Sequence, residues 1–206
     1  MVFTASSRWR TLSSEESWLA DAYPRSGRLF VDVGANVGQW TKPLAVNYER
    51  VIAIEPDPRA CAQLETNLPK NVRVMRKAVW STEGVHTLNI FSSTRHGSIV
   101  RETADEQSGP RQGHLEVETI TLDSLNLEGV DFVKVDTEGA EYEILKGAIQ
   151  TLKRSHPKLL IEIHNKENGE AIPQFLSSLG YQVRVIRHPE YAVGSEAWLM
   201  HFWLSC

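Results

Sequence analysis

The stretch "RLFVDVGANVGQW", residues 28–40, decides the fold. Residues 28–34 are apolar enough to form a strand that is buried on both faces. Gly34 and Gly38 flank the turn that follows, and glycine allows a tight turn in which the backbone approaches a ligand closely. The amides at the start of the next helix would point at that ligand. We therefore expect the first strand–turn–helix unit of an α/β sheet.

The rest of the chain repeats this alternation of strands and helices. Strands are expected over residues 50–56, 71–75, 130–136 and 157–164, with β segments at 86–91 and 115–125 and a closing hairpin at 181–187 and 197–204. Stripes of apolar residues at intervals of three and four predict helices over residues 37–48 (around Pro43), 61–68, 140–152 and 172–179 (before Gly180). The pattern predicts an α/β fold with about seven strands in a mostly parallel sheet.

The composition favours a single domain over residues 1–206. A chain of 206 residues that is 41% hydrophobic can bury one sizeable core. We expect a helical N-terminal extension over residues 1–27, because Ser13 and Glu16 have the spacing of a capping box. The polar stretch over residues 92–113 is long for a connection, so we interpret it as a lid or binding loop.

Charge, cysteine content and hydrophobicity argue against several classes of protein. The net charge of -4 argues against nucleic acid as the partner. Two cysteines far apart in the sequence form no disulfide framework and no metal-ligand spacing. No stretch reaches the length of a membrane span, and the N-terminus lacks the apolar core of a signal peptide. We expect a soluble, cytoplasmic protein, whose oligomeric state the sequence leaves open.

Two acidic residues at strand ends indicate the ligand. Asp32 lies beside the glycine turn, where a carboxylate repels pyrophosphate and favours an ammonium group. Glu55 ends the second strand, about 20 residues past the turn, where an acid can accept both ribose hydroxyls of a nucleoside. Asn36 stands where the dinucleotide fingerprint needs glycine, which disfavours a NAD-dependent reductase. A cationic amino acid joined to adenosine fits these features, and S-adenosylmethionine is such a molecule.

Six blocks of sequence carry a resemblance to a known family. In order they are "FVDVGANVGQW", "VIAIEPDPRACAQLETNL", "KAVWSTEG", "VETITLDSL", "VDFVKVDTEGAEYEILKGA" and "LLIEIH". Over residues 29–164 the chain resembles the FkbM-type S-adenosylmethionine-dependent methyltransferases. The resemblance implies the Rossmann-like class I methyltransferase fold, with a seven-stranded, mostly parallel sheet, an antiparallel last strand and helices on both faces. It also implies methylation of hydroxyls on sugars, polyketides or other secondary metabolites.

The resemblance also implies which residues bind the cofactor. Asp32, Gly34, Asn36 and Gly38 would hold the methionine part, Glu55 the ribose, Pro56 and Asp57 the adenosine edge, and Lys77 and Ala78 would lie near the adenine. Pro43 departs from a regular helix after the glycine turn, and the part beyond His164 has no distinctive motif for a substrate pocket.

The block "VDTEGAE" supplies the first candidate catalytic residues. Asp136 ends a core strand that lies beside the first strand in this fold class, so it can reach the cofactor's methyl group or an incoming hydroxyl. Glu138 follows in the turn and is either part of the site or part of the turn. Glu141, in the first turn of the next helix, is expected to satisfy backbone amides there.

Two histidines and one further acid complete the candidate set. Glu162 and His164 are two residues apart near a strand end, so they share one face of that strand. His164 could act as a base or bind substrate, or be a hydrogen-bonded strand-end histidine. His96 lies in the long loop and could contact substrate or be exposed to solvent.

A divalent metal is one further option, because some O-methyltransferases use one and Mg²⁺ prefers carboxylate-rich sites. The sequence shows no second dense group of acids, so we expect no metal. The predicted function is O-methylation of a saccharide or secondary metabolite with S-adenosylmethionine. The alternatives are N-methylation of a small molecule and a regulatory module that binds S-adenosylmethionine without turnover.

Overall fold

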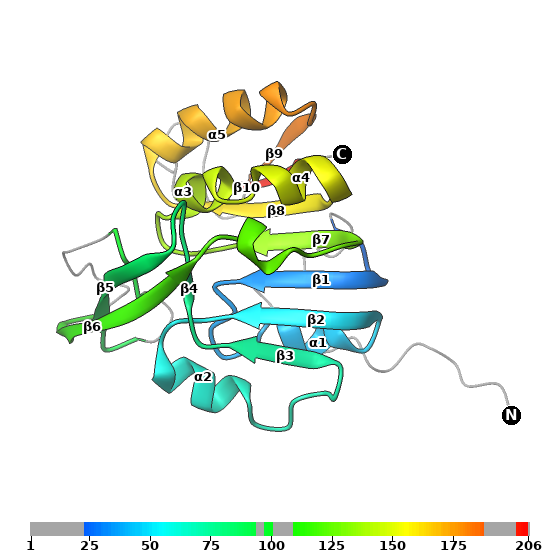
Figure 1. Cartoon of the computed structure of the whole chain (residues 1–206). Helices are drawn as coiled ribbons and strands as arrows, with labels where there is room; N and C mark the ends of the chain where they lie inside the picture. The colour runs from blue at the N-terminus through cyan, green and yellow to red at the C-terminus, as the bar shows by residue number, and fades with distance from the viewer. Residues whose placement is uncertain (1–22, 94–96, 101–108, 188–200, 206) are drawn as a thin grey trace, which may run out of the picture.

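A seven-stranded sheet forms the centre of the computed structural model, which describes residues 23–93, 97–100, 109–187 and 201–205 (Figure 1). Its strands are β1 (Gly27–Val33), β2 (Tyr48–Ile54), β3 (Val72–Met75), β7 (Val130–Val135), β8 (Lys158–Ile163), β9 (Val183–Arg187) and β10 (His201–Ser205). Their order across the sheet is β3-β2-β1-β7-β8-β10-β9. Only β10 runs antiparallel to its neighbours, β8 and β9. The predicted fold class, including the antiparallel last strand, is confirmed.

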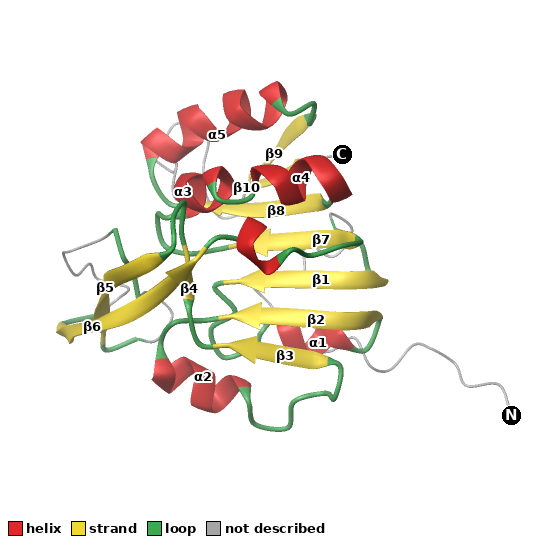
Figure 2. Ribbon diagram, viewed as in Figure 1, coloured by secondary structure: helices red, strands yellow, loops and turns green. Residues whose placement is uncertain are grey.

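Helices cover both faces of this sheet (Figure 2). They are α1 (Thr41–Ala45), α2 (Pro58–Leu64), α3 (Glu141–Lys146), α4 (Ile149–Ser155) and α5 (Lys166–Ser178). Because side chains alternate along a strand, Val31 of β1 packs in the cluster that contains α3, α4 and α5, whereas Phe30 packs with α1. Both residues are at most 1% exposed, so β1 is buried on both faces, as its sequence predicts.

The helix predicted over residues 37–48 is much shorter than expected. Only Thr41–Ala45 is helical, and Tyr48 already opens β2. The side-chain amide of Asn71 donates to the carbonyl oxygens of Ala45 and Tyr48 at 2.7 Å each. It thereby satisfies the Ala45 carbonyl, which is left without a partner where the helix ends. This cap comes from a residue 26 positions away in sequence, so the local apolar stripe could not reveal it.

The single helix predicted over residues 140–152 is wrong, because the structure divides it into α3 and α4. The Asp123 carboxylate accepts from the backbone amides of Gln150 at 2.9 Å and Thr151 at 2.7 Å, and so caps the start of α4. Gly147, between the two helices, has no room for a side chain, since a Cβ would lie 2.3 Å from the carbonyl oxygen of Trp80.

A second, three-stranded sheet stands at the carboxyl ends of the central strands (Figure 1). It consists of β4 (Ala78–Val79), β5 (Gly84–Phe91) and β6 (Arg111–Ile120), in the order β4-β6-β5. The predicted loop over residues 92–113 connects β5 to β6, but its last three residues belong to β6. Residues 94–96 and 101–108 of this loop, and residues 1–22 of the predicted N-terminal extension, lie outside the described part. No described helix is long and apolar enough to cross a membrane.

Candidate active site

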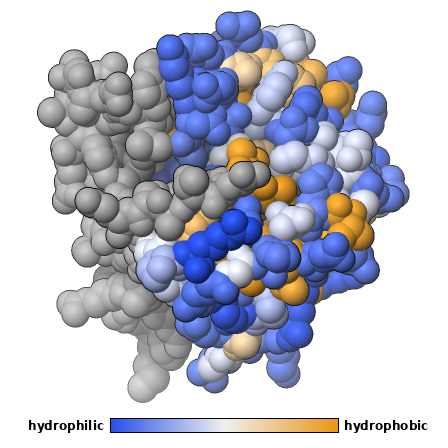
Figure 3. Space-filling view, turned by 90° about the vertical axis from the view of Figure 1, so that its left-hand side faces the viewer, coloured by the Kyte–Doolittle hydropathy of each residue, from blue (hydrophilic) through white to orange (hydrophobic). Residues whose placement is uncertain are grey.

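A cavity of about 190 Å³ opens at the carboxyl ends of β1, β2, β7 and β8. Most of the predicted site residues line it: Gly34, Asn36, Glu55, Pro56, Lys77, Ala78, Asp136, Glu138 and Glu162. They come from segments up to 128 positions apart, and the parallel strands bring them to one edge of the sheet. Figure 3 looks onto this side of the molecule, where hydrophilic residues surround a few hydrophobic ones among the described atoms. This is where ligands bind in open α/β sheets.

Glu55 lies at the end of β2 with both carboxylate oxygens directed to backbone amides. The amide of Asn36 donates to Oε2 and that of Asp57 donates to Oε1, each at 2.8 Å. Each carboxylate oxygen has a second lone pair, so Glu55 can still accept from two ligand hydroxyls. Burial raises the pKa of Glu55 to about 7, although the two amides oppose the shift.

Three predicted cofactor residues lie behind the cavity wall. Asp32 is fully buried and accepts from the Thr41 hydroxyl at 2.5 Å, while its other oxygen has no hydrogen-bond partner in the described part of the chain. Burial is the main reason why the pKa of Asp32 is raised. Asp57 caps α2 by accepting from the Arg59 amide at 2.8 Å. Gly38 packs against α2, where a Cβ would lie 2.6 Å from Leu64. Direct contact of these residues with the cofactor stays a prediction.

Gly34 has a reason to be glycine that the sequence did not reveal. Its φ of +75° is the left-handed conformation, and a Cβ would lie 1.8 Å from the carbonyl oxygen of Asp136. The turn after β1 and the turn after β7 therefore touch through their backbones. This contact places the predicted cofactor turn directly beside the predicted catalytic carboxylate.

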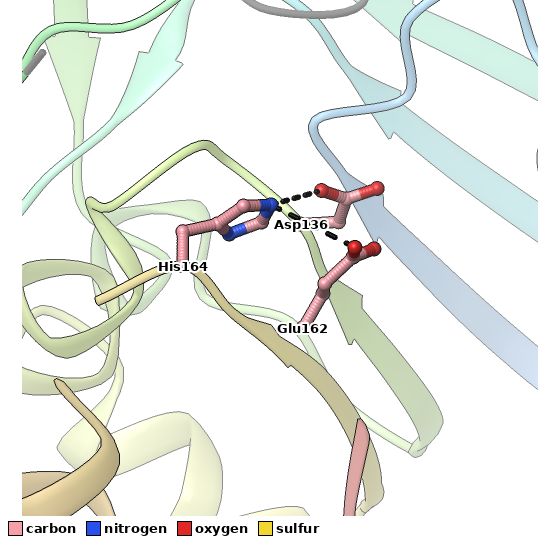
Figure 4. Close-up of side chains that lie close together, drawn as sticks. All are labelled: Asp136, Glu162 and His164. Carbon is pink, nitrogen blue, oxygen red and sulfur yellow. Dashed lines mark ion pairs between the residues drawn. The ribbon is translucent and has the colours of Figure 1, made fainter. Parts of the chain in front are cut away.

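At the other end of the cavity, Asp136 and Glu162 lie next to His164 (Figure 4). Nε2 of His164 is 3.6 Å from an oxygen of Asp136, 3.8 Å from one of Glu162 and 3.9 Å from one of Glu138. The sequence predicted each of these four residues separately, and the structure brings them together. His164 itself is not part of the described cavity lining; it lies behind the three carboxylates that are.

Burial and neighbouring charges shift the pKa values of three residues in this cluster. Burial alone would raise the pKa of Asp136, but Lys134 and His164 outweigh it and lower that pKa. Burial, together with the negative charge of Asp136, raises the pKa of Glu162 to about 8. Burial would lower the pKa of His164, but the neighbouring carboxylates, Glu141 foremost, raise it well above 6.5. At neutral pH, Asp136 is therefore ionised, whereas Glu162 and His164 carry protons.

Lys134 lines the cavity but was not predicted from the sequence. Its side chain is 3% exposed and lines the cavity, with Nζ 3.0 Å from Asp136 and 3.7 Å from Asp32. It also lies over the ring of Trp40, 5.9 Å from the centroid. A lysine inside the apolar strand "VDFVKVD" was the available signal, because buried lysines are rare unless they are paired.

Glu138 belongs to both the turn and the cavity. Its φ is +56°, an unfavourable conformation for a residue with a side chain, and such strain gathers at functional sites. Its carbonyl oxygen accepts from the Ser98 hydroxyl at 2.7 Å. Through this bond the described residues 97–100 of the long loop are tied to the site, and Gly97 and Ile99 line the cavity. His96 lies outside the described residues.

Three of these residues could also bind a metal ion. Asp136, Glu162 and His164 each offer one ligand atom, and these atoms lie within 4.8 Å of one another. The acidic group that the sequence seemed to lack is thus assembled from β7 and β8. The ammonium group of Lys134 already lies against Asp136, however, and supplies a positive charge there. The expectation that no metal is used stays a prediction.

A model of the "Methyltransferase FkbM domain" family matches residues 32–183. The chain belongs to this family. S-adenosylmethionine is the cofactor of FkbM methyltransferases, which confirms the predicted cofactor. Glu55, the acid predicted to bind the ribose, and Asp136, the predicted catalytic carboxylate, line the same cavity.

Curated relatives and a solved structure agree with the family assignment. The chain is 28% identical to the methyltransferase SdnD of Sordaria araneosa over 59% of this chain and 61% of that protein. It is 26% identical to the hexuronic acid methyltransferase AglP of Haloferax volcanii over 79% of this chain and 68% of that protein. The crystal structure of methyltransferase FkbM from Methylobacillus flagellatus shares the fold, with a TM-score of 0.61 and 20% identity over 88% of this chain and 44% of that one. The chain thus spans less than two thirds of two of these proteins.

Proposed function

We propose that this protein transfers the methyl group of S-adenosylmethionine to a hydroxyl group of a saccharide or secondary metabolite. The observation that carries the proposal is the position of Asp136, which is ionised at neutral pH and lines the same cavity as Glu55. Glu55 would bind the ribose at one end, so that Asp136 meets the acceptor at the other. The saccharide part of the proposal is supported by the similarity to a hexuronic acid methyltransferase.

This function implies a role in methyl transfer for each residue at the acceptor end of the cavity. The cofactor supplies an activated methyl group, so the protein must mainly hold the hydroxyl in line with it. A hydroxyl that is acquiring a methyl group becomes strongly acidic, and Asp136 is positioned to take its proton. Lys134, at 3.0 Å, keeps Asp136 in the ionised form that can do so. Glu138 and Glu162 line the same end and would contact the acceptor, whereas His164 acts from behind them. His96 stays a predicted acceptor contact.

N-methylation is the second candidate, and one observation favours it. Three acidic residues, Asp136, Glu138 and Glu162, line the acceptor end, and the ionised Asp136 among them would attract an ammonium group. A regulatory module without turnover would need the cofactor end alone. The ionised carboxylate beside that end, held by a buried lysine, supports an enzyme over such a module.

Release of S-adenosylhomocysteine over a panel of acceptors tests this function. The panel contains saccharides, uronic acids and polyketide alcohols, together with matched amines, and each acceptor is measured with and without EDTA. We expect turnover with a hydroxyl acceptor, unchanged by EDTA, and a loss of about 100-fold or more in Asp136→Asn. Glu143→Gln, on the exposed side of α3, is the matched control and should keep the wild-type rate.

The outcomes separate the alternatives. Turnover with amines alone would establish N-methylation, and cofactor binding without turnover of any acceptor would favour the regulatory module. An Asp136→Asn enzyme as fast as the wild type would remove Asp136 from the mechanism. Loss of activity in EDTA, restored by Mg²⁺, would show that the Asp136, Glu162 and His164 cluster holds a metal.

A further inference from the structure

Glu141 forms more contacts than a helix cap requires. It is the first residue of α3 and its side chain is 0% exposed. Oε1 accepts from the backbone amide of Gly139 at 2.8 Å, which is the capping role that the sequence predicts. The same oxygen lies 2.8 Å from Nδ1 of His164, and Oε2 accepts from the side-chain amide of Asn168, on α5, at 2.5 Å. A buried carboxylate thus joins α3, the end of β8 and α5.

The contact to Nδ1 determines how His164 is used. A carboxylate only accepts hydrogen bonds, so Nδ1 must carry the proton that faces Glu141. The ring is then fixed with Nε2 directed at Asp136 and Glu162, at 3.6 and 3.8 Å (Figure 4). Nε2 also lies 3.9 Å from an oxygen of Glu138. A carboxylate that fixes the tautomer and orientation of a histidine in this way is common at functional sites.

The acceptor end needs the charge that His164 can provide. Asp136, Glu138 and Glu162 gather there, and Lys134 from β7 is the lysine that faces Asp136. An imidazolium within 3.9 Å of all three acidic groups stabilises the ionised form of Asp136 and opposes the effect of Asp136 on Glu162. The pKa of His164, which Glu141 and the other carboxylates raise well above 6.5, agrees with this charge state.

We propose that Glu141 is a positioning residue for the methyl transfer, which holds the His164 ring so that Nε2 faces Asp136, Glu138 and Glu162. The inference rests on the proposed function for its effect on turnover, but its structural part concerns His164 alone. A residue that only capped α3 would affect the stability of the protein and leave the protonation of His164 and the pH dependence of turnover unchanged.

Glu141→Gln is the main test, because it keeps the size of the side chain and removes its charge. The pKa of the His164 imidazole is measured by NMR in the protein without acceptor. We expect it to fall toward the ordinary value of about 6.5, while Glu143→Gln on the same helix leaves it unchanged. This readout does not depend on which acceptor is methylated.

Turnover gives the second readout. Because the imidazolium assists Asp136, the basic limb of the kcat profile should move to lower pH in Glu141→Gln, with a fall in kcat of about tenfold or more at neutral pH. The Kd for S-adenosylmethionine should stay within about threefold, because Glu55 and the glycine turn are untouched. His164→Asn keeps a donor toward Glu141 but removes Nε2, so it should lower kcat in the same way if Glu141→Gln does not fold.

The results distinguish this inference from the proposed function. An unchanged His164 pKa in Glu141→Gln, or full turnover in His164→Asn, would overturn the positioning role. A lowered His164 pKa without turnover of any acceptor would leave the Glu141–His164 pair in place and contradict the proposed function instead.

Discussion

At the scale of single residues, the burial of Glu55 opposes the charge state that its proposed role in ribose binding needs. The residue is 6% exposed, and burial disfavours the charged form of its carboxyl group. The ionised form is nevertheless the one that accepts hydrogen bonds from ribose hydroxyls. With a pKa of about 7, the residue is divided between both forms at neutral pH.

This pKa predicts a pH dependence of cofactor binding. The pKa is raised, so Glu55 gains a proton as the pH falls through about 7, and the affinity for S-adenosylmethionine should fall with it. If the ionised form alone binds, the loss approaches tenfold for each pH unit below about 7 and disappears above about 8. Calorimetry from pH 5.5 to 8.5 measures it, with Glu55→Gln as the reference for all other titrating groups. The same pH dependence in both proteins would contradict the ribose role of Glu55.

Residue types and positions predicted many of the residues in the site, but not the ion pairs and hydrogen bonds between them. Glu55, Asp136 and Glu162 were found because acids at strand ends of a parallel sheet meet at one edge. Lys134 was missed because its partners, Asp32 and Asp136, become visible only when the register pairs Asp32 with Lys134 across two strands. Glu141 was predicted as a cap, and its bond to His164 depends on how the turn after β8 packs on α3.

At the scale of elements, the contact between the turn after β1 and the turn after β7 places the predicted cofactor turn beside Asp136. Gly34 allows this contact, because its missing Cβ leaves space for the carbonyl oxygen of Asp136. Gly180, after α5, offers a comparison: its φ is +88°, but nothing lies within 4 Å of the Cβ position. The two glycines share the backbone conformation and differ only in their surroundings.

Gly34→Ala and Gly180→Ala should therefore differ in stability. Alanine in the left-handed conformation costs about 1 to 2 kcal/mol at either site. At Gly34 the clash with the backbone of Asp136 adds about 1 to 3 kcal/mol. Urea unfolding measures both free energies, and we expect Gly34→Ala to be the less stable variant by that margin. Equal losses would mean that the two turns can separate without cost.

The elements themselves were predicted to different degrees. The central strands were predicted because runs of apolar residues mark strands that are buried on both faces. The division into α3 and α4 and the early end of α1 could not be predicted, because Asp123 and Asn71 cap these helices from distant positions. Two strands of the second sheet, β5 and β6, were predicted as β segments, but β4 was not, because it is two residues long and pairs with β6 some 40 positions later.

At the scale of the whole molecule, the proposed sites for the cofactor and the acceptor lie at different strand ends along one cavity. In the proposed function, the carboxyl ends of β1 and β2 would bind the cofactor, and those of β7 and β8 would bind the acceptor; residues from all four strand ends line the cavity. In the connection between β5 and β6, Gly97 and Ile99 line the same cavity, and Ser98 donates to the carbonyl oxygen of Glu138. The acceptor is therefore expected to be selected by β8 and by this connection, where the sequence has no recognisable motif.

The central claim is that this cavity binds S-adenosylmethionine through Glu55. Calorimetry at pH 8 with S-adenosylmethionine, S-adenosylhomocysteine and NAD tests it most directly, in the wild type and in Glu55→Ala. The account predicts that the first two ligands bind, that NAD does not, and that Glu55→Ala weakens both by about tenfold or more, since two charge-assisted hydrogen bonds are lost. Binding of NAD alone, or wild-type affinity in Glu55→Ala, would contradict it.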